Sequence, residues 1–174
     1  SIMLLIFLTV LVVLIVFSAV LSGAETALFS LPSFTVKKYR CSKEQKKTLV
    51  AALLRSPSQL LVTIMMLNVF ANIMVQNVVS HLFADTSSLL LKIGLPLLLT
   101  LLLGEIIPKS LALAHNEEVS LKVAQGIFMA QKILGPFRVA LTYLTSFLSR
   151  ILFFFLQTES LVSNKELEHV LKDS

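Results

Sequence analysis

The sequence predicts an all-α integral membrane domain with three transmembrane helices plus amphipathic juxtamembrane helices. Hydrophobic residues make up 56% of the 174 residues and charged residues only 14%, whereas soluble domains average about 45–50% and about 25%. Long apolar runs recur at roughly the 20-residue length that crosses a ~30 Å hydrocarbon core. Basic residues gather in one loop between two of these runs.

The predicted spans lie at 2–21, about 59–83 and about 87–114. The first carries no charged residue and lacks the basic n-region of a signal peptide, so a membrane span is favoured over a cleaved leader. The second is preceded by Ser56 and Pro57, a combination typical of a helix start. A short polar turn beginning at Asp85 separates the second span from the third.

Lysine and arginine predict the orientation of these spans. The turn near 81–87 has no basic residue, whereas the loop 30–58 has Lys37, Lys38, Arg40, Lys43, Lys46, Lys47 and Arg55. The positive-inside rule places this loop in the cytoplasm. We therefore expect a multi-pass protein of the cell membrane, with its N-terminus outside and its C-terminus cytoplasmic. The net charge of +5 then reflects membrane topology, so lipid and not nucleic acid is the expected partner.

The stretch 117–157 is predicted to form a juxtamembrane belt. Charged residues punctuate it at helical spacing, and Gly135-Pro136 divides it into two amphipathic helices lying at the cytoplasmic interface. The part from 141 to 156 has only one charged residue, Arg150. A short fourth span is therefore the alternative for that part.

The sequence changes to polar composition after residue 157. Ser163 followed by Glu166 resembles a capping box that starts a soluble helix. We therefore expect a transmembrane domain over 1–157, and the start of a truncated cytoplasmic region over 158–174.

Polar side chains occur at two places inside the first two spans. Ser18 and Ser22 are four residues apart and so share a helix face, and Asn68, Asn72 and Gln76 form a carboxamide stripe at the same spacing. Polar residues at membrane depth usually face protein or a water-filled cavity and indicate function. A hydrogen-bonded seam between packed helices is the alternative for both groups.

The third polar group is the segment "LLLGEIIPKSLA" (101–112). Pro108 has no N–H, so in an α-helix the Gly104 carbonyl loses its donor, and the Glu105 carboxylate is adjacent. Broken helices with free carbonyls coordinate cations in many transporters. The alternative is a kink in which Glu105 is protonated or paired with Lys109, four residues on.

The three polar groups all fall in the middle-to-cytoplasmic part of the bilayer when counted at ~1.5 Å per residue. Their hydroxyl, amide, carbonyl and carboxylate groups offer oxygen ligands, which suit Mg²⁺ or Ca²⁺, whereas zinc and copper favour His or Cys. His81 and His115 stand alone at span ends, and Cys41 is the sole cysteine. Neither a zinc-protease motif nor a Ser/His pair in a plausible site occurs, so we do not expect an enzyme.

Two segments, "LSGAETALFSLPS" and "GEIIPKSLALAH", resemble signatures of the CNNM/CorC family of magnesium transporters, and "LLVTIMMLNVFANI" is similar to a third. The resemblance covers essentially the whole chain as the transmembrane domain of that family. It implies a homodimer of three-span subunits that moves Mg²⁺ outward, coupled to Na⁺. It also implies that ATP would bind only to a following pair of CBS modules, of which 158–174 is the approach.

The resemblance also implies which residues ligate the ion, when it is carried over residue by residue. The family often has two adjacent asparagines where this chain has Asn68-Val69, which leaves open which amide of the second span ligates. Mg²⁺ transport is the expected function, and a non-transporting Mg²⁺ sensor or regulator is the alternative. Mg²⁺ is favoured over Ca²⁺ by the resemblance alone, because oxygen ligands admit both. The implied metal ligands are Ser18, Ser22, Asn68, Asn72, Gly104 through its carbonyl, and Glu105.

Overall fold

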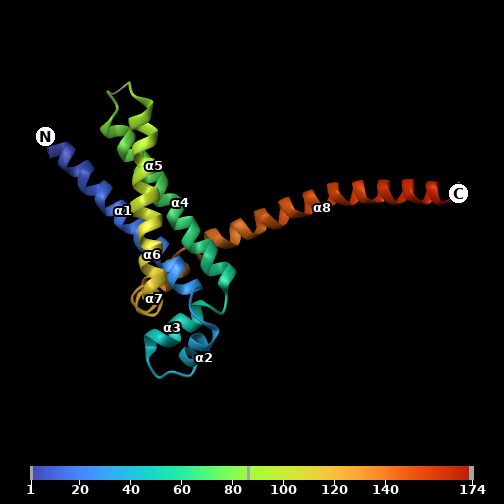
Figure 1. The fold of residues 1–174 in the computed structure, drawn as a ribbon, viewed down its shortest axis with the longest axis horizontal. Helices are drawn as coiled ribbons and strands as arrows, with labels where there is room; N and C mark the ends of the chain where they lie inside the picture. The colour runs from blue at the N-terminus through green and yellow to red at the C-terminus, as the bar shows by residue number, and fades with distance from the viewer. Residues whose placement is uncertain (1, 86, 173–174) are drawn as a thin grey trace. The chain divides into compact units, whose positions relative to one another are not determined.

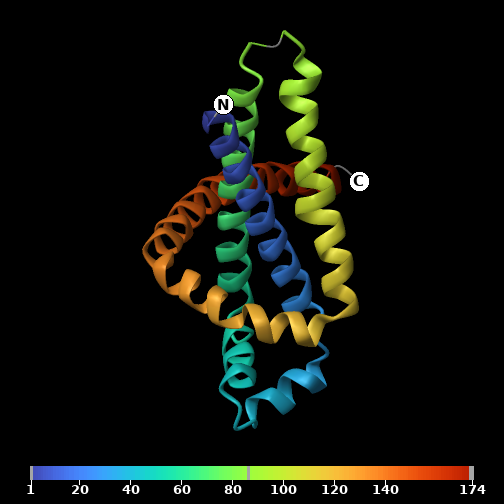
Figure 2. The same ribbon diagram turned by 90° about the vertical axis from the view of Figure 1, so that its left-hand side faces the viewer.

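The computed structural model describes the backbone of residues 2–85 and 87–172, and side chains as far as residue 154. All regular elements among these residues are helices (Figures 1 and 2). The chain divides into two compact units, Ser1–Ile133 and Leu134–Ser174. The all-α membrane prediction is confirmed. Four helical segments, one more than predicted, are long and apolar enough to cross a membrane: Ile2–Phe29, Pro57–Leu82, Leu90–Ala114 and Gly135–Phe154.

Helix α1 (Ile2–Phe29) is central to the first unit. It continues past the predicted end at residue 21, because no proline interrupts the segment that follows, which contains the good helix formers Ala24, Glu25, Ala27 and Leu28. At ~1.5 Å per residue it is roughly 42 Å long, about the full thickness of a bilayer with its headgroup regions. It contacts α4 (Pro57–Leu82), η2 (Thr100–Ile106), α6 (Ile107–Ala114) and α7 (Asn116–Ile133).

The third span alternates between two helical registers. It begins as the π-helix η1 (Leu90–Gly94), continues as α5 (Leu95–Leu99), widens again in η2 and ends as α6. The second residue of each α segment is a proline, Pro96 in α5 and Pro108 in α6. A proline cannot donate the α-helical hydrogen bond, so each change of register lies just before a missing donor.

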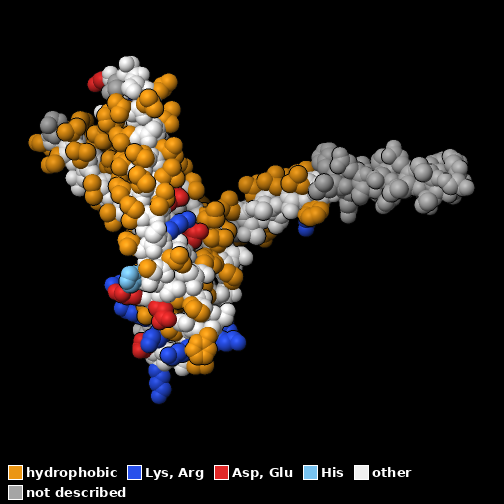
Figure 3. Space-filling model, in the orientation of Figure 1, with side chains coloured by type: hydrophobic (Ala, Val, Ile, Leu, Met, Phe, Trp, Pro, Cys, Tyr) orange, Lys and Arg blue, Asp and Glu red, His pale blue; other side chains and the backbone are white. Residues whose placement is uncertain are grey.

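The basic loop 30–58 contains two short helices, α2 (Ser33–Arg40) and α3 (Gln45–Leu53). Tyr39 and Val50 are buried in a hydrophobic core that also includes Leu28 of α1 and Ile127 of α7. The two helices and α7 therefore cover one end of the spans. Charged side chains gather at this end, while hydrophobic side chains cover the spans (Figure 3).

The predicted division of the belt at Gly135-Pro136 is confirmed, since α7 ends at Ile133 and α8 (Gly135–Lys172) begins two residues later. Helix α7 packs one face against the rest of the first unit, where Ser120, Ala124 and Ile127 are buried, and its interfacial position stays a prediction.

The prediction that a new helix begins at Ser163 is wrong, because α8 is continuous from Gly135 to Lys172. No glycine or proline follows Pro136 in the sequence to end the helix. The Ser163 and Glu166 side chains of the expected capping box lie outside the described side chains. The boundary between 1–157 and 158–174 stays a prediction.

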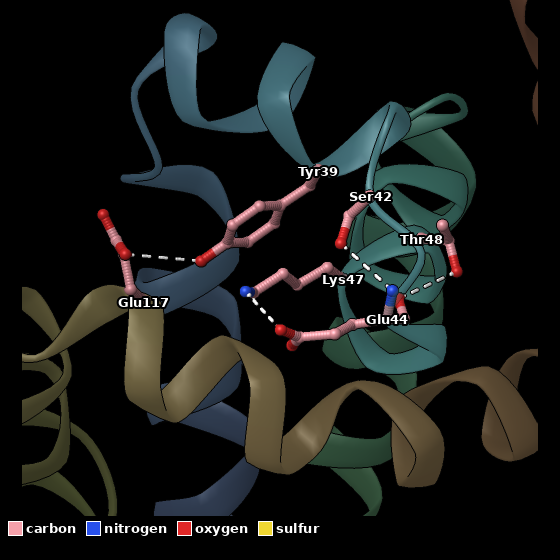
Figure 4. Close-up of polar contacts among 6 residues, drawn as sticks. All are labelled: Tyr39, Ser42, Glu44, Lys47, Thr48 and Glu117. Atoms are coloured by element: carbon pink, nitrogen blue, oxygen red, sulfur yellow. Dashed lines mark hydrogen bonds and ion pairs between the residues drawn. The ribbon is translucent and has the colours of Figure 1, made fainter.

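Tyr39 links the basic loop to α7 through its hydroxyl. Its ring is only 4% exposed, and its Oη donates a hydrogen bond to Glu117 Oε2 at 3.4 Å (Figure 4). Burial, and then the negative charge of Glu117, raise the pKa of the Tyr39 phenol above its ordinary value of 10.0. The folded protein therefore holds this proton more tightly than the unfolded chain. The resulting stability is present below about pH 10 and is lost as the pH rises through the folded-state pKa.

This pKa can be measured directly in a Tyr143→Phe variant, which leaves Tyr39 as the only tyrosine. Ultraviolet absorbance of tyrosinate in the folded protein should give a midpoint above 10, because burial disfavours the charged form. Adding Glu117→Gln should lower the midpoint, because it removes a neighbouring negative charge. A midpoint at the ordinary value in the folded protein would contradict the buried placement of Tyr39.

Candidate metal site between the spans

Ser18 is the point where the first two spans meet through polar side chains. It is 1% exposed, and its Oγ lies 2.9 Å from Asn68 Oδ1 and 3.3 Å from Asn72 Oδ1. The two asparagines are one helical turn apart on α4 and so present a common face. A hydroxyl has a single proton, so Ser18 can donate to only one of the two amide oxygens at a time. The three oxygens thus share one hydroxyl proton.

Gly104 brings the third span to the same place. It is buried in η2, and a Cβ atom built on it would lie 3.0 Å from Ser18 Oγ and 3.6 Å from Ser18 Cβ. The first distance is shorter than ordinary van der Waals contact, so a side chain at this position would require Ser18 to shift by a few tenths of an ångström. Ser18, Asn68, Asn72 and Gly104 are hereafter called the Ser18 cluster.

Ser22 lies one turn from Ser18 on α1 and is 0% exposed. Its Oγ has no hydrogen-bond partner among the described residues. A buried hydroxyl left unpaired typically costs about 1–3 kcal/mol. The unpaired oxygen beside the Ser18 cluster is therefore available to a cation or to a water that a cation carries.

Glu105 follows Gly104 directly in the chain. Its side chain is half-buried, and its carboxylate forms no ion pair or hydrogen bond with any described residue. Lys109 pairs instead with Glu25 of α1, with 3.7 Å between Nζ and Oε2. The structure therefore does not contain the Glu105–Lys109 pair of the kink alternative.

The backbone around Glu105 follows the wider register. The Ile107 N–H donates to the Leu102 carbonyl, five residues back. Counted in this register, the carbonyl opposite Pro108 belongs to Leu103, whereas α-helical counting gives Gly104. The proline removes one donor from this stretch in either register. The specific role of the Gly104 carbonyl stays a prediction.

The predicted carboxamide stripe divides between two locations. Asn68 and Asn72 face Ser18, whereas Gln76 Nε2 donates to the Lys92 carbonyl at 3.0 Å. Gln76 therefore connects α4 to η1 and lies outside the Ser18 cluster. The sequence spacing alone places all three amides on one face and does not separate them.

The ion pair between Glu25 and Lys109 is a contact near the site that the sequence did not predict. Its side chains are 27% and 40% exposed, so it contributes little stability by itself. It joins the two segments that carry the family resemblance. The presence of both residues in these two segments was the one sign in the sequence that they could be related. The sequence gives their opposite charges but not the distance between them.

The chemistry of the Ser18 cluster suits a hard cation. Among the residues that the structure describes, no group of three or more His, Cys, Asp or Glu side chains could hold a metal ion. The oxygens that meet there belong to a hydroxyl and two amides, and the residue after Gly104 in the chain, Glu105, carries a carboxylate. Such oxygen ligands fit Mg²⁺ or Ca²⁺, and Mg²⁺ in particular keeps several of its waters.

A comparison with protein-family models assigns the chain to a family. The family model for the cyclin M transmembrane N-terminal domain (CNNM) matches residues 9–174. A search of curated protein sequences found no significant match. The matched range includes the helices that supply Ser18, Asn68 and Gly104. With almost its whole length matched, the chain belongs to the CNNM family as a cyclin M transmembrane domain.

Proposed function

We propose that this membrane domain moves Mg²⁺ out of the cell through the Ser18 cluster and Glu105, with Ser22 as a further oxygen one turn away. Membership of a metal-transport family supports this proposal. The observation that carries it is the convergence of Ser18, Asn68 and Asn72 oxygens at 2.9 and 3.3 Å, closed on the third side by a glycine.

The proposed ligand set suits an ion that must be released again. Mg²⁺ is usually held by one or two carboxylates, with water completing its octahedral shell. Here Glu105 is the single charged ligand, and the neutral oxygens replace part of the hydration shell. A site of this kind leaves the ion with a net positive charge, which favours transit over permanent retention.

The remaining parts of the mechanism are carried over from the family resemblance. We propose a homodimer with the basic loop in the cytoplasm, the N-terminus outside and outward movement of Mg²⁺ coupled to Na⁺. Three spans cross the membrane, and α8 lies at the cytoplasmic interface, where Arg138 and Arg150 meet the headgroups. A short fourth span over Gly135–Phe154 is the competing topology. ATP would act only through CBS modules of full-length members.

Transport is tested by reconstituting the full chain in liposomes and measuring Mg²⁺ flux with a trapped fluorescent indicator. Asn68→Ala should reduce flux by about tenfold, because it removes an oxygen ligand and the acceptor of the Ser18 hydroxyl, together worth about 1–2 kcal/mol. Mg²⁺ binding by calorimetry should weaken by a similar factor.

Asn77→Ala provides the matched control, because Asn77 is an exposed amide on the same helix and lies outside the Ser18 cluster. It should leave flux and binding at wild-type levels. Equal loss in both variants would assign the effect to the helix rather than to the site. Mg²⁺ binding by the wild-type chain without any flux would favour the sensor over the transporter.

A further inference from the structure

A second site lies away from the Ser18 cluster, in the basic end of the molecule. A pocket of about 930 Å³ opens between α2, the turn after it and the start of α7. The lining includes three lysines, Lys37, Lys38 and Lys47, together with Tyr39, Glu117 and Cys41. The transport proposal uses none of these residues.

The lysines of this pocket are unequally neutralised. Lys47 Nζ lies 2.9 Å from Glu44 Oε1 (Figure 4), and Glu117 accepts the hydrogen bond from Tyr39. Lys37 and Lys38 are exposed and have no ion pair with any described residue. The pocket therefore has an excess of positive charge, carried by two lysines that are consecutive in the sequence and have no carboxylate partner among the described residues.

The position of the pocket indicates where that anion comes from. Helix α2 follows α1 after the segment 30–32, and α7 begins just beyond the end of α6. Asn116 Nδ2 donates to the Ser30 carbonyl at 3.2 Å, which joins the ends of these two spans. The pocket thus lies directly beyond the ends of two candidate spans, which is where headgroups are expected if these helices cross the membrane. Phe34 also lines it and is 78% exposed, as is typical of apolar side chains on helices that lie at a membrane interface.

We propose that this pocket binds the phosphate group of an anionic lipid headgroup. Clusters of lysine and arginine immediately beyond a transmembrane helix attract anionic lipids, and here the cluster lines a pocket instead of a flat surface. The ammonium groups of Lys37 and Lys38 would contact the phosphate oxygens, while Phe34 faces the acyl boundary. A soluble phosphate has the same charged group but lacks the acyl chains. The inference stands apart from Mg²⁺ transport.

Cys41 allows occupancy of the pocket to be measured. It is the only cysteine of the chain and is exposed, so its alkylation by neutral N-ethylmaleimide reports on access. The full chain would be compared in phosphatidylcholine nanodiscs, in nanodiscs that also contain phosphatidylglycerol, and in phosphatidylcholine nanodiscs with added inorganic pyrophosphate. We expect phosphatidylglycerol to slow alkylation several-fold and pyrophosphate to leave it unchanged. Protection by pyrophosphate alone, or by neither anion, would overturn the lipid assignment.

Two variants of equal charge separate the pocket from general surface attraction. Lys37→Gln with Lys38→Gln should abolish the protection by phosphatidylglycerol. Lys43→Gln with Lys46→Gln removes the same charge from exposed positions that do not line this pocket and should preserve it. Equal loss of protection in both variants would show a diffuse electrostatic effect and would contradict a defined site.

Discussion

Replacement of Glu105 by glutamine is expected to abolish Mg²⁺ flux and to weaken Mg²⁺ binding by about 100-fold. Glutamine keeps the size of the side chain and one oxygen but removes the only negative charge of the proposed ligand set. Interactions that involve a charged group are worth about 1.5–3 kcal/mol, and each 1.4 kcal/mol corresponds to about tenfold in affinity. Calorimetry of the purified protein and flux in liposomes would measure the two effects.

Glu118→Gln is the control for this substitution. Glu118 is exposed on α7 and pairs with Lys122 at 2.6 Å between Oε1 and Nζ, so its loss changes net charge equally at a distance from the Ser18 cluster. An exposed pair of this kind contributes little to stability, and we expect wild-type binding and flux. If Glu105→Gln bound Mg²⁺ as the unaltered protein does, the carboxylate would not be a ligand and the proposed site would be wrong.

The main features of the fold could be predicted because they depend on local composition. Apolar runs of membrane length predicted the first three spans, and the break at Gly135 followed from a glycine and a proline in sequence. The burial of Tyr39 and Val50 could not be predicted, because the helices of the basic loop are fixed by packing against α7, more than 60 residues away in the chain. Local patterns do not contain such long-range contacts.

The candidate site could be predicted in its members but not in its geometry. A polar side chain in an apolar run is costly unless it has a partner or a function. This cost identifies Ser18, Asn68 and Glu105 as candidate site residues. Nothing in the spacing shows that one hydroxyl faces two amides while Gln76 bonds elsewhere. The register change before Pro108 was also missed, because a proline predicts the loss of a hydrogen bond but not the way in which the helix accommodates it.

The least predictable feature is the close approach of Gly104 to Ser18, and it leads to a sharp test. Gly104→Ala would place a Cβ 3.0 Å from Ser18 Oγ, so the hydroxyl or the third span must move. We expect the Ser18–Asn68 hydrogen bond to be disturbed and Mg²⁺ flux to fall by about tenfold, equivalent to ~1.4 kcal/mol. Flux in liposomes and thermal unfolding of the purified protein would record the change.

Gly94→Ala is a chemically identical substitution on the same span, where a Cβ would have no heavy atom within 4 Å. Alanine in a helix is favoured over glycine by about 0.5–1 kcal/mol, so this variant should be as stable as the wild type or more stable, with normal flux. The Gly104→Ala protein should therefore be less stable than the Gly94→Ala protein. Ser18→Ala removes the hydroxyl that Gly104→Ala would displace. The loss of Mg²⁺ flux in the double variant should therefore be smaller than the sum of the losses in the two single variants. Additive losses would show that Gly104 acts through contacts other than Ser18.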